Sequence, residues 1–110
     1  MTYQTTYEET APDSAELAQQ QGLYLLEFGT NWCGHCKAAQ SAIAPVLAEF
    51  PALPHRKVED GPGRALGRSF RVKLWPTLVL LNNGQEVGRL VRPTTPEAVQ
   101  SLLAAAARAI

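Results

Sequence analysis

The sequence has only two cysteines, no net charge and no long hydrophobic run. Two cysteines exclude a disulfide-rich scaffold and a four-cysteine zinc site. Ten Lys and Arg balance ten Asp and Glu, so the chain lacks the excess positive charge that attracts nucleic acid or anionic lipid. Its apolar runs reach about six residues, far below the roughly 20 that span a membrane. We therefore expect neither nucleic acid nor a membrane as a partner.

The N-terminal residues 1–13 have neither the basic part nor the apolar part of a secretion signal. We expect a cytoplasmic protein, or a periplasmic or secreted one if a signal peptide has been removed. Hydrophobic residues make up 45% of the 110 residues and charged residues 18%, which is enough apolar surface for one core. The prediction is a single domain over residues 1–110, and a monomer.

Hydrophobic periodicity and turn residues predict alternating strands and helices. The predicted strands are 2–7, 23–28, 55–59, 77–81 and 85–91, and the predicted helices are 15–21, 33–50, 63–70 and one capped by Thr94 or Thr95 with Pro96 in its first turn. Asn82-Asn83-Gly84 is typical of a hairpin, and Pro45 predicts a kink in the second helix. This order favours an α/β fold with a central mixed β-sheet and helices on both faces.

Cys33-Gly34-His35-Cys36 follows a buried strand, at the point where a helix begins. Unpaired N–H groups and the helix dipole favour an anion at this end, so we expect a lowered pKa for Cys33. His35 favours the thiolate as well, either as a cation or as a hydrogen-bond donor. A lowered pKa makes Cys33 a better leaving group and stabilises the reduced form, which predicts a fairly oxidising pair.

Three other uses of the cysteines are less consistent with the sequence. A structural disulfide that closes four residues contributes at most about 2 kcal/mol in the chain-entropy model. Attachment of c-type haem needs a histidine directly after the second cysteine, where Lys37 stands. A metal held by both cysteines and His35 lacks a fourth ligand, because His55 is distant in sequence. We expect no cofactor and no metal, only a redox-active Cys33–Cys36 disulfide.

Glu27 is the one acid in the apolar strand before the cysteines. Desolvation raises the pKa of a lone buried carboxyl, which could then hold a proton near neutrality and exchange it with Cys36 through a water. The alternative is that Glu27 faces a sheet edge or forms a salt bridge.

The segments LLEFGTNWCGHCK and FRVKLWPTLVLLNNGQEV resemble the thioredoxin fold family over nearly the whole chain, and the CGHC core is typical of protein disulfide isomerase domains. The resemblance implies that Cys33 is the nucleophile and Cys36 the buried resolving thiol. It places Glu27 where the family has a buried Asp, and Lys57 where a neighbouring Lys is found. Pro76 is then the cis proline that faces the disulfide, next to backbone that pairs with an extended substrate.

The resemblance also implies a substrate-docking surface, formed by Trp32, Gly34, Trp75, Pro76, Thr77 and Arg92. Ser41 stands where thioredoxins have a helix-kinking proline, so the kink moves to Pro45. Trp75 replaces a smaller aliphatic residue and Arg92 replaces a glycine, which would narrow and charge the docking surface.

These features favour a thiol–disulfide oxidoreductase that acts on protein disulfides or dithiols and is recycled by an upstream reductase or oxidant. In a reducing compartment it would act as a reductase, and after export as an oxidase or isomerase. The hypothesis from another class is a redox-silent module that uses Trp32, Trp75 and Arg92 to hold a partner.

Overall fold

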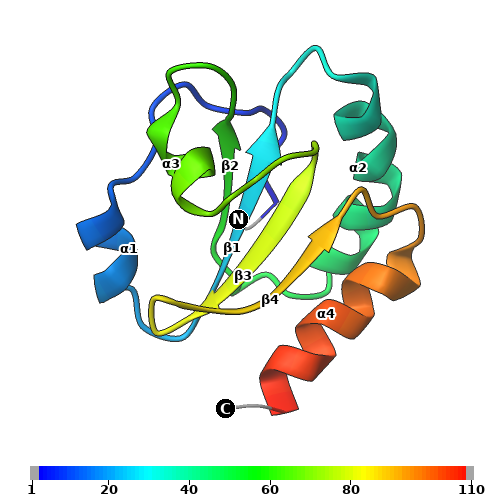
Figure 1. Ribbon diagram of the computed structural model, residues 1–110. Coiled ribbons are helices and arrows are strands. Elements are labelled where there is room, and N and C mark those ends of the chain that lie inside the picture. Colours follow the sequence, from blue (N-terminus) through cyan, green and yellow to red (C-terminus); the bar gives the residue numbers. More distant parts are fainter. Residues whose placement is uncertain (1–2, 109–110) are drawn as a thin grey trace.

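The computed structural model describes the backbone of residues 3–108 and the side chains of residues 3–105. Strands and helices alternate along most of the chain, and the last two strands form a hairpin (Figure 1). The elements are α1 (Ser14–Gln19), β1 (Leu23–Gly29), α2 (Gly34–Leu47), β2 (His55–Glu59), α3 (Ala65–Ser69), β3 (Thr77–Asn82), β4 (Gln85–Val91) and α4 (Pro96–Arg108). Thr95 caps α4, accepting a hydrogen bond from the Ala98 N–H at 3.3 Å.

The four strands form one mixed sheet in the order β2-β1-β3-β4. Strand β1 is parallel to β2 and antiparallel to β3, and β3 is antiparallel to β4. Asn83 and Gly84 turn the hairpin with positive φ values of 51° and 80°, the conformation of a tight two-residue turn. The predicted α/β architecture with a mixed sheet is therefore confirmed.

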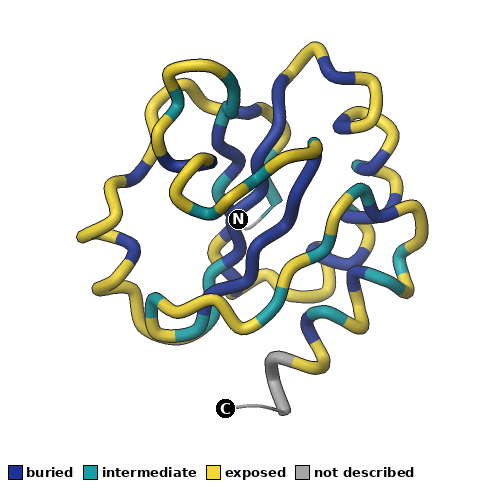
Figure 2. The backbone as a smooth tube through the Cα atoms, in the orientation of Figure 1, coloured by how far each residue is buried: buried dark blue, intermediate teal, exposed yellow. Residues whose placement is uncertain are grey.

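Helices cover both faces of the sheet, with α2 and α4 on one side and α1 and α3 on the other (Figure 1). Successive strand residues face opposite sides of the sheet. Leu25 and Leu80 pack with side chains of α2 and α4. Leu26 and Val79 pack on the other face, in one cluster with Leu17 of α1 and Leu66 of α3. The central strands are buried along most of their length (Figure 2). Glu27 therefore faces α2, on the same side as Leu25.

The predicted strand over 2–7 is wrong in its described part, residues 3–7, and residue 2 lies outside the described residues. Only an isolated parallel bridge forms, between Glu8 and Val58. Side chains satisfy backbone groups that a strand would pair: the Gln4 N–H donates to His55 Nδ1 at 3.0 Å, and the Tyr7 N–H donates to Asn31 Oδ1 at 2.7 Å. The segment thus runs beside β2 without joining the sheet.

Helix α2 begins one residue later than predicted and ends three residues earlier, because Cys33 is its N-cap and the chain turns after Leu47. The helix continues through Pro45, and the Ala48 N–H still bonds to the Ala44 carbonyl at 3.0 Å. The kink itself stays a prediction. No helix within residues 3–108 has both the length and the apolar character needed to cross a membrane.

Candidate active site

The two cysteines lie at the start of α2, just beyond the end of β1 (Figure 1). Both are free thiols. Cys33 has extended backbone and caps the helix, and its Sγ accepts a hydrogen bond from the Cys36 N–H at 3.4 Å. The exposed fraction is 9% for Cys33 and 1% for Cys36. Both residues are buried, and Cys33 is the more accessible of the two.

Opposing effects act on Cys33. Burial raises the pKa of its thiol, but hydrogen bonds from the Cys36 side chain and from the backbone N–H groups of Cys36 and His35 lower it, as does the Arg92 cation. The net direction of the pKa is downward, as the sequence predicts. His35 acts through its backbone N–H, and Arg92, predicted only as a docking residue, supplies the positive charge.

Burial and the interaction with Cys33 outweigh the opposing effects of Thr30 and Tyr7, and together they raise the pKa of Cys36 to about 11. A cavity of about 60 Å³ lies beside this residue, lined in part by Tyr7, Lys37, Gln40 and Lys57. Its volume exceeds the roughly 30 Å³ that one water molecule occupies. Cys36 is thus a protonated thiol beside a cavity large enough to hold a water molecule.

The Glu27 carboxylate is fully buried and accepts hydrogen bonds from three side chains. These donors are the Tyr7 hydroxyl, Gln40 Nε2 at 2.9 Å and His55 Nε2 at 2.9 Å. Lys57 Nζ lies 3.9 Å from Glu27 Oε2. Burial alone would raise the pKa of Glu27, but these donors and the Lys57 charge lower it. The expectation of a lone carboxyl that holds a proton near neutrality is therefore wrong, and the salt-bridge alternative holds.

His55 has a defined tautomer. Its Nδ1 accepts the Gln4 N–H, so the ring proton must be on Nε2, which donates to Glu27. The imidazole is then neutral, and Lys57 carries the charge that balances Glu27. Lys57 also donates to Gln40 Oε1 at 3.2 Å and lies 4.4 Å from the centre of the Tyr7 ring.

The parallel register of β1 and β2 explains this cluster. Leu25 pairs with His55, and Glu27 pairs with Lys57. Residues two apart share a face, so His55 and Lys57 reach the same side as Glu27. In the sequence, the spacing of His55 and Lys57 two residues apart in a predicted strand was the one indication of this cluster. It shows that they contact Glu27 only once the pairing of β1 with β2 is known.

Tyr7 was missed by the sequence analysis, because it sits in a predicted strand with no motif around it. Its ring and the Cys36 sulfur pack against the same residue, Gly29. Burial and the Glu27 carboxylate raise the pKa of Tyr7, and the nearby Tyr7 hydroxyl lowers the pKa of Cys36. Asn31 fixes the Tyr7 backbone by accepting from its N–H and donating to its carbonyl, at 2.7 and 3.1 Å. The phenol thus lies between Glu27 and the resolving cysteine.

Of the predicted docking residues, Trp75 packs against the two cysteines, and Arg92 is near enough to act on the charge of Cys33. Trp32 is 72% exposed, and its ring meets that of Trp75 edge to face at 5.8 Å. The Trp75–Pro76 peptide bond is cis. Thr77 turns its hydroxyl back to the Leu74 carbonyl at 2.6 Å, and open space faces Gly34. Arg92 Nε donates to the Trp75 carbonyl at 2.8 Å. The roles of these residues in binding substrate stay predictions.

The sequence model of the thioredoxin family matches residues 5–105. The chain belongs to the thioredoxin family. The structure is similar to thioredoxin 2 of Pseudomonas aeruginosa PAO1 in its reduced form, with 53% identity and a TM-score of 0.79 over 93% of this chain and 98% of that one. Family membership implies thiol–disulfide oxidoreductase activity.

Curated relatives match a shorter part of the chain. A thioredoxin of Chlamydia trachomatis is 34% identical over 64% of this chain and 69% of its own length. Thioredoxin H2-1 of Oryza sativa subsp. japonica is 33% identical over 63% of this chain, and the match spans 50% of that relative. Protein disulfide-isomerase A4 of Bos taurus is 42% identical over 57% of this chain and 10% of that protein.

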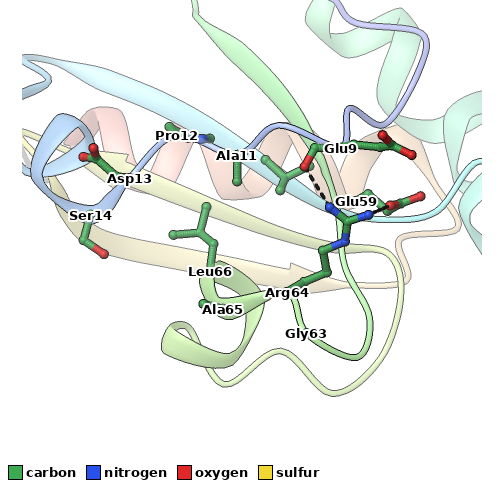
Figure 3. A pocket seen from close by; sticks show the side chains of 11 residues that line it. Glu9, Ala11, Pro12, Asp13, Ser14, Glu59, Gly63, Arg64, Ala65 and Leu66 are labelled. Atoms are coloured by element: carbon green, nitrogen blue, oxygen red, sulfur yellow. Dashed lines mark hydrogen bonds and ion pairs between the residues drawn. The ribbon is translucent and has the colours of Figure 1, made fainter.

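Thioredoxins need no cofactor beyond the redox-active disulfide. Within residues 3–108, no group of three or more His, Cys, Asp and Glu is placed to hold a metal ion. A second pocket, of about 380 Å³, lies away from the thiols, between residues 9–14 and α3 (Figure 3). Arg64 crosses it, donating to the Glu9 carbonyl at 2.9 Å and to the Glu59 carboxylate. These two hydrogen bonds of Arg64 connect the N-terminal segment that carries Tyr7 to Glu59 of β2. We therefore interpret the pocket as a structural feature.

We expect Gly29→Ala to destabilise this site. A Cβ atom at position 29 would lie 2.6 Å from Cys36 Sγ and 2.8 Å from Tyr7 Cζ, so both must move. Overpacking of this kind costs about 1–3 kcal/mol in the free energy of unfolding, measured by urea denaturation. Gly34→Ala is the matched control, since a Cβ there meets nothing within 4 Å and alanine favours a helix. Equal stability of the two variants would contradict the close packing.

Proposed function

We propose that this chain reduces protein disulfides, with Cys33 as the attacking thiolate and Cys36 as the resolving thiol. Cys33 Sγ attacks one sulfur of the substrate disulfide, and the other substrate sulfur leaves with the electron pair and takes a proton. Cys36 then loses its proton and attacks Cys33 Sγ, which releases the second substrate thiol. The two electrons of the dithiol pass to the substrate, and the chain is left with a Cys33–Cys36 disulfide.

The observation that carries this proposal is the difference between the two thiols. Cys33 is the more accessible of the two thiols, has a lowered pKa and directly follows the exposed Trp32. Cys36 is buried, and its pKa is raised to about 11. It is therefore protonated and does not react with disulfides in solution until a mixed disulfide forms at Cys33. The same order of attack is implied by thioredoxin family membership.

The direction of exchange depends on the compartment. A pair near the roughly −180 mV typical of isomerase domains stays reduced against a cytosolic glutathione poise of about −220 mV or lower. We therefore propose a cytoplasmic disulfide reductase that an upstream reductase returns to the dithiol form. An exported form of the same domain would oxidise or isomerise instead.

Reduction of insulin by dithiothreitol, followed as turbidity, tests the function. We expect the wild-type protein to accelerate precipitation and Cys33→Ser to abolish the acceleration, because no thiolate remains to attack. Mixed with insulin in the absence of dithiothreitol, pre-reduced Cys36→Ser should form a mixed disulfide that persists on a non-reducing gel, since the resolving sulfur is missing. A wild-type rate equal to that of Cys33→Ser would refute the reductase and favour the redox-silent module.

A further inference from the structure

Arg92 occupies a backbone conformation that normally favours glycine. It follows β4 with φ = 50°, in the left-handed region where a Cβ atom is unfavourable. Asn83, which also has positive φ, lies in the hairpin turn, where asparagine is common. Arg92 has no such explanation from the turn alone. Strained residues of this kind cluster at functional sites, but Arg71 also has a positive φ of 57°, so the contacts of Arg92 must carry the argument.

The contacts of Arg92 fix its side chain beside the nucleophile. Its N–H donates to the Pro76 carbonyl at 2.9 Å, and its Nε donates to the Trp75 carbonyl at 2.8 Å. Main chain and side chain are thus both attached to the loop that faces Cys33. The charge is close enough to help lower the pKa of Cys33. The guanidinium is half-buried and held in a defined position.

The two terminal nitrogens of Arg92 have no hydrogen-bond acceptor among the described residues. Arg92 lines a pocket of about 220 Å³ together with His35, Ala38, Ala39, Pro93 and Thr94, and none of these residues is an acid. A guanidinium with two open N–H groups matches a carboxylate, which it can bind in a bidentate manner. The pocket is smaller than the 300–1,000 Å³ typical of whole small-molecule ligands. One acidic side chain fits it better.

A carboxylate lies at the indole N–H of Trp75, whereas Arg92 lies at its carbonyl. Asp60 Oδ2 accepts the Trp75 indole N–H at 2.8 Å, so an acidic substrate residue is repelled there and attracted toward Arg92. Arg92 also occupies the Trp75 carbonyl that an extended substrate would otherwise use. Recognition therefore depends less on the substrate backbone and more on its side chains.

We propose that Arg92 makes this site selective for protein disulfides in which an Asp or Glu lies next to the attacked cysteine. This inference rests on the proposed reductase function and specifies its substrate class. The carboxylate would bind the terminal nitrogens of Arg92 in the pocket formed with His35, and so hold the substrate sulfur near Cys33. A neutral or basic neighbour would lose this contact.

Three peptide disulfides that differ only in the residue beside the cysteine, Glu, Gln or Lys, test the inference. The measurement is the second-order rate constant of reduction by the fully reduced protein, followed by tryptophan fluorescence in a stopped-flow instrument. We expect the Glu peptide to react about three- to tenfold faster than the Gln peptide, the range of one charge-assisted contact at a half-exposed site, and the Lys peptide to be slowest. The ratio should shrink in high salt.

Arg92→Gly should bring the rate constants for the Glu and Gln peptides to within about twofold of each other. The fold should be kept, because glycine adopts this φ freely. A general change in Cys33 reactivity would affect all three peptides equally and leave the ratio unchanged. The matched control is Arg71→Gly, which removes the same charge from an exposed position with φ = 57° and should keep the wild-type ratio. Arg92→Lys should give an intermediate ratio, because it keeps the charge without the fork.

Equal wild-type rates for the Glu and Gln peptides would overturn the inference while leaving the reductase intact. A ratio that survives Arg92→Gly, or that Arg71→Gly also abolishes, would overturn it as well. Failure of the wild-type protein to reduce any of the three peptides would instead contradict the proposed function.

Discussion

Replacing Glu27 by alanine should lower the free energy of unfolding by about 3–5 kcal/mol, the range for removing one partner of a buried ion pair. The substitution leaves Lys57 buried without its counter-charge and leaves the Tyr7 hydroxyl and the His55 Nε2–H without an acceptor. Urea denaturation measures the effect, as a lower midpoint at an unchanged m-value.

The surface offers a matched control for this substitution. Glu86 also forms an ion pair, with Arg89 at 2.6 Å, and the hydrogen bond from Arg89 lowers the pKa of Glu86. Both side chains are about one-third exposed, so Glu86→Ala should change stability by less than about 1 kcal/mol. The double variant of Glu27→Gln with Lys57→Met should recover part of the loss, because it removes both charges. A gain in stability in Glu27→Ala would mean that desolvation of the carboxylate outweighs its partners.

The pH dependence of stability follows from the same cluster. The pKa of Glu27 is lower in the folded chain than the roughly 4.3 of an unfolded glutamate. Its contribution is therefore fully present above that unfolded value and is lost as the pH falls through the folded pKa. Wild-type stability should decline on acidification below about pH 4.3, and Glu27→Gln should remove that part of the decline.

The sequence was sufficient for the features that depend on neighbouring residues. Apolar runs and turn residues located the regular elements from β1 to α4, and the position of Cys33 at a helix start predicted its lowered pKa. Helix caps, hairpin turns and strand periodicity act over a few residues, so each is visible in a short window of sequence. The ends of these elements shifted by one to three residues at α2 and by one residue at the ends of β1 and β3.

The features that depend on distant residues could not be predicted in the same way. The state of Glu27 depends on Tyr7, Gln40, His55 and Lys57, which converge through strand pairing and through a segment that is not a strand. Residues 3–7 have the composition of a strand, but side chains from β2 and Asn31 bind their backbone instead. Desolvation raises the pKa of Glu27, and its hydrogen bonds and ion pair lower it. The sequence alone indicates only the desolvation, because the partners come from distant segments.

The asymmetry of the two thiols leads to the last prediction, on their reaction with iodoacetamide at pH 7. With a pKa of about 11, Cys36 is about 0.01% thiolate at this pH, against roughly 3% for an ordinary cysteine with a pKa of about 8.5. A thiolate of higher pKa is also a stronger nucleophile, by about 18-fold here at a Brønsted slope of about 0.5. This gain offsets only part of the roughly 300-fold deficit in thiolate. Burial of Cys36 and the lowered pKa of Cys33 widen the gap again.

We therefore expect Cys33 to be alkylated more than about 20-fold faster than Cys36 in the native, reduced protein, as measured by quenching at intervals and mapping the modified peptides by mass spectrometry. In concentrated urea the helix N-terminus and the burial are lost, so the two rates should become equal. Raising the pH toward 11 should accelerate Cys36 more than Cys33, because the pKa of Cys36 is about 11 and that of Cys33 is lowered. Similar native rates at pH 7 would mean that both thiols ionise alike, and the order of attack proposed for the reductase would then have no physical basis.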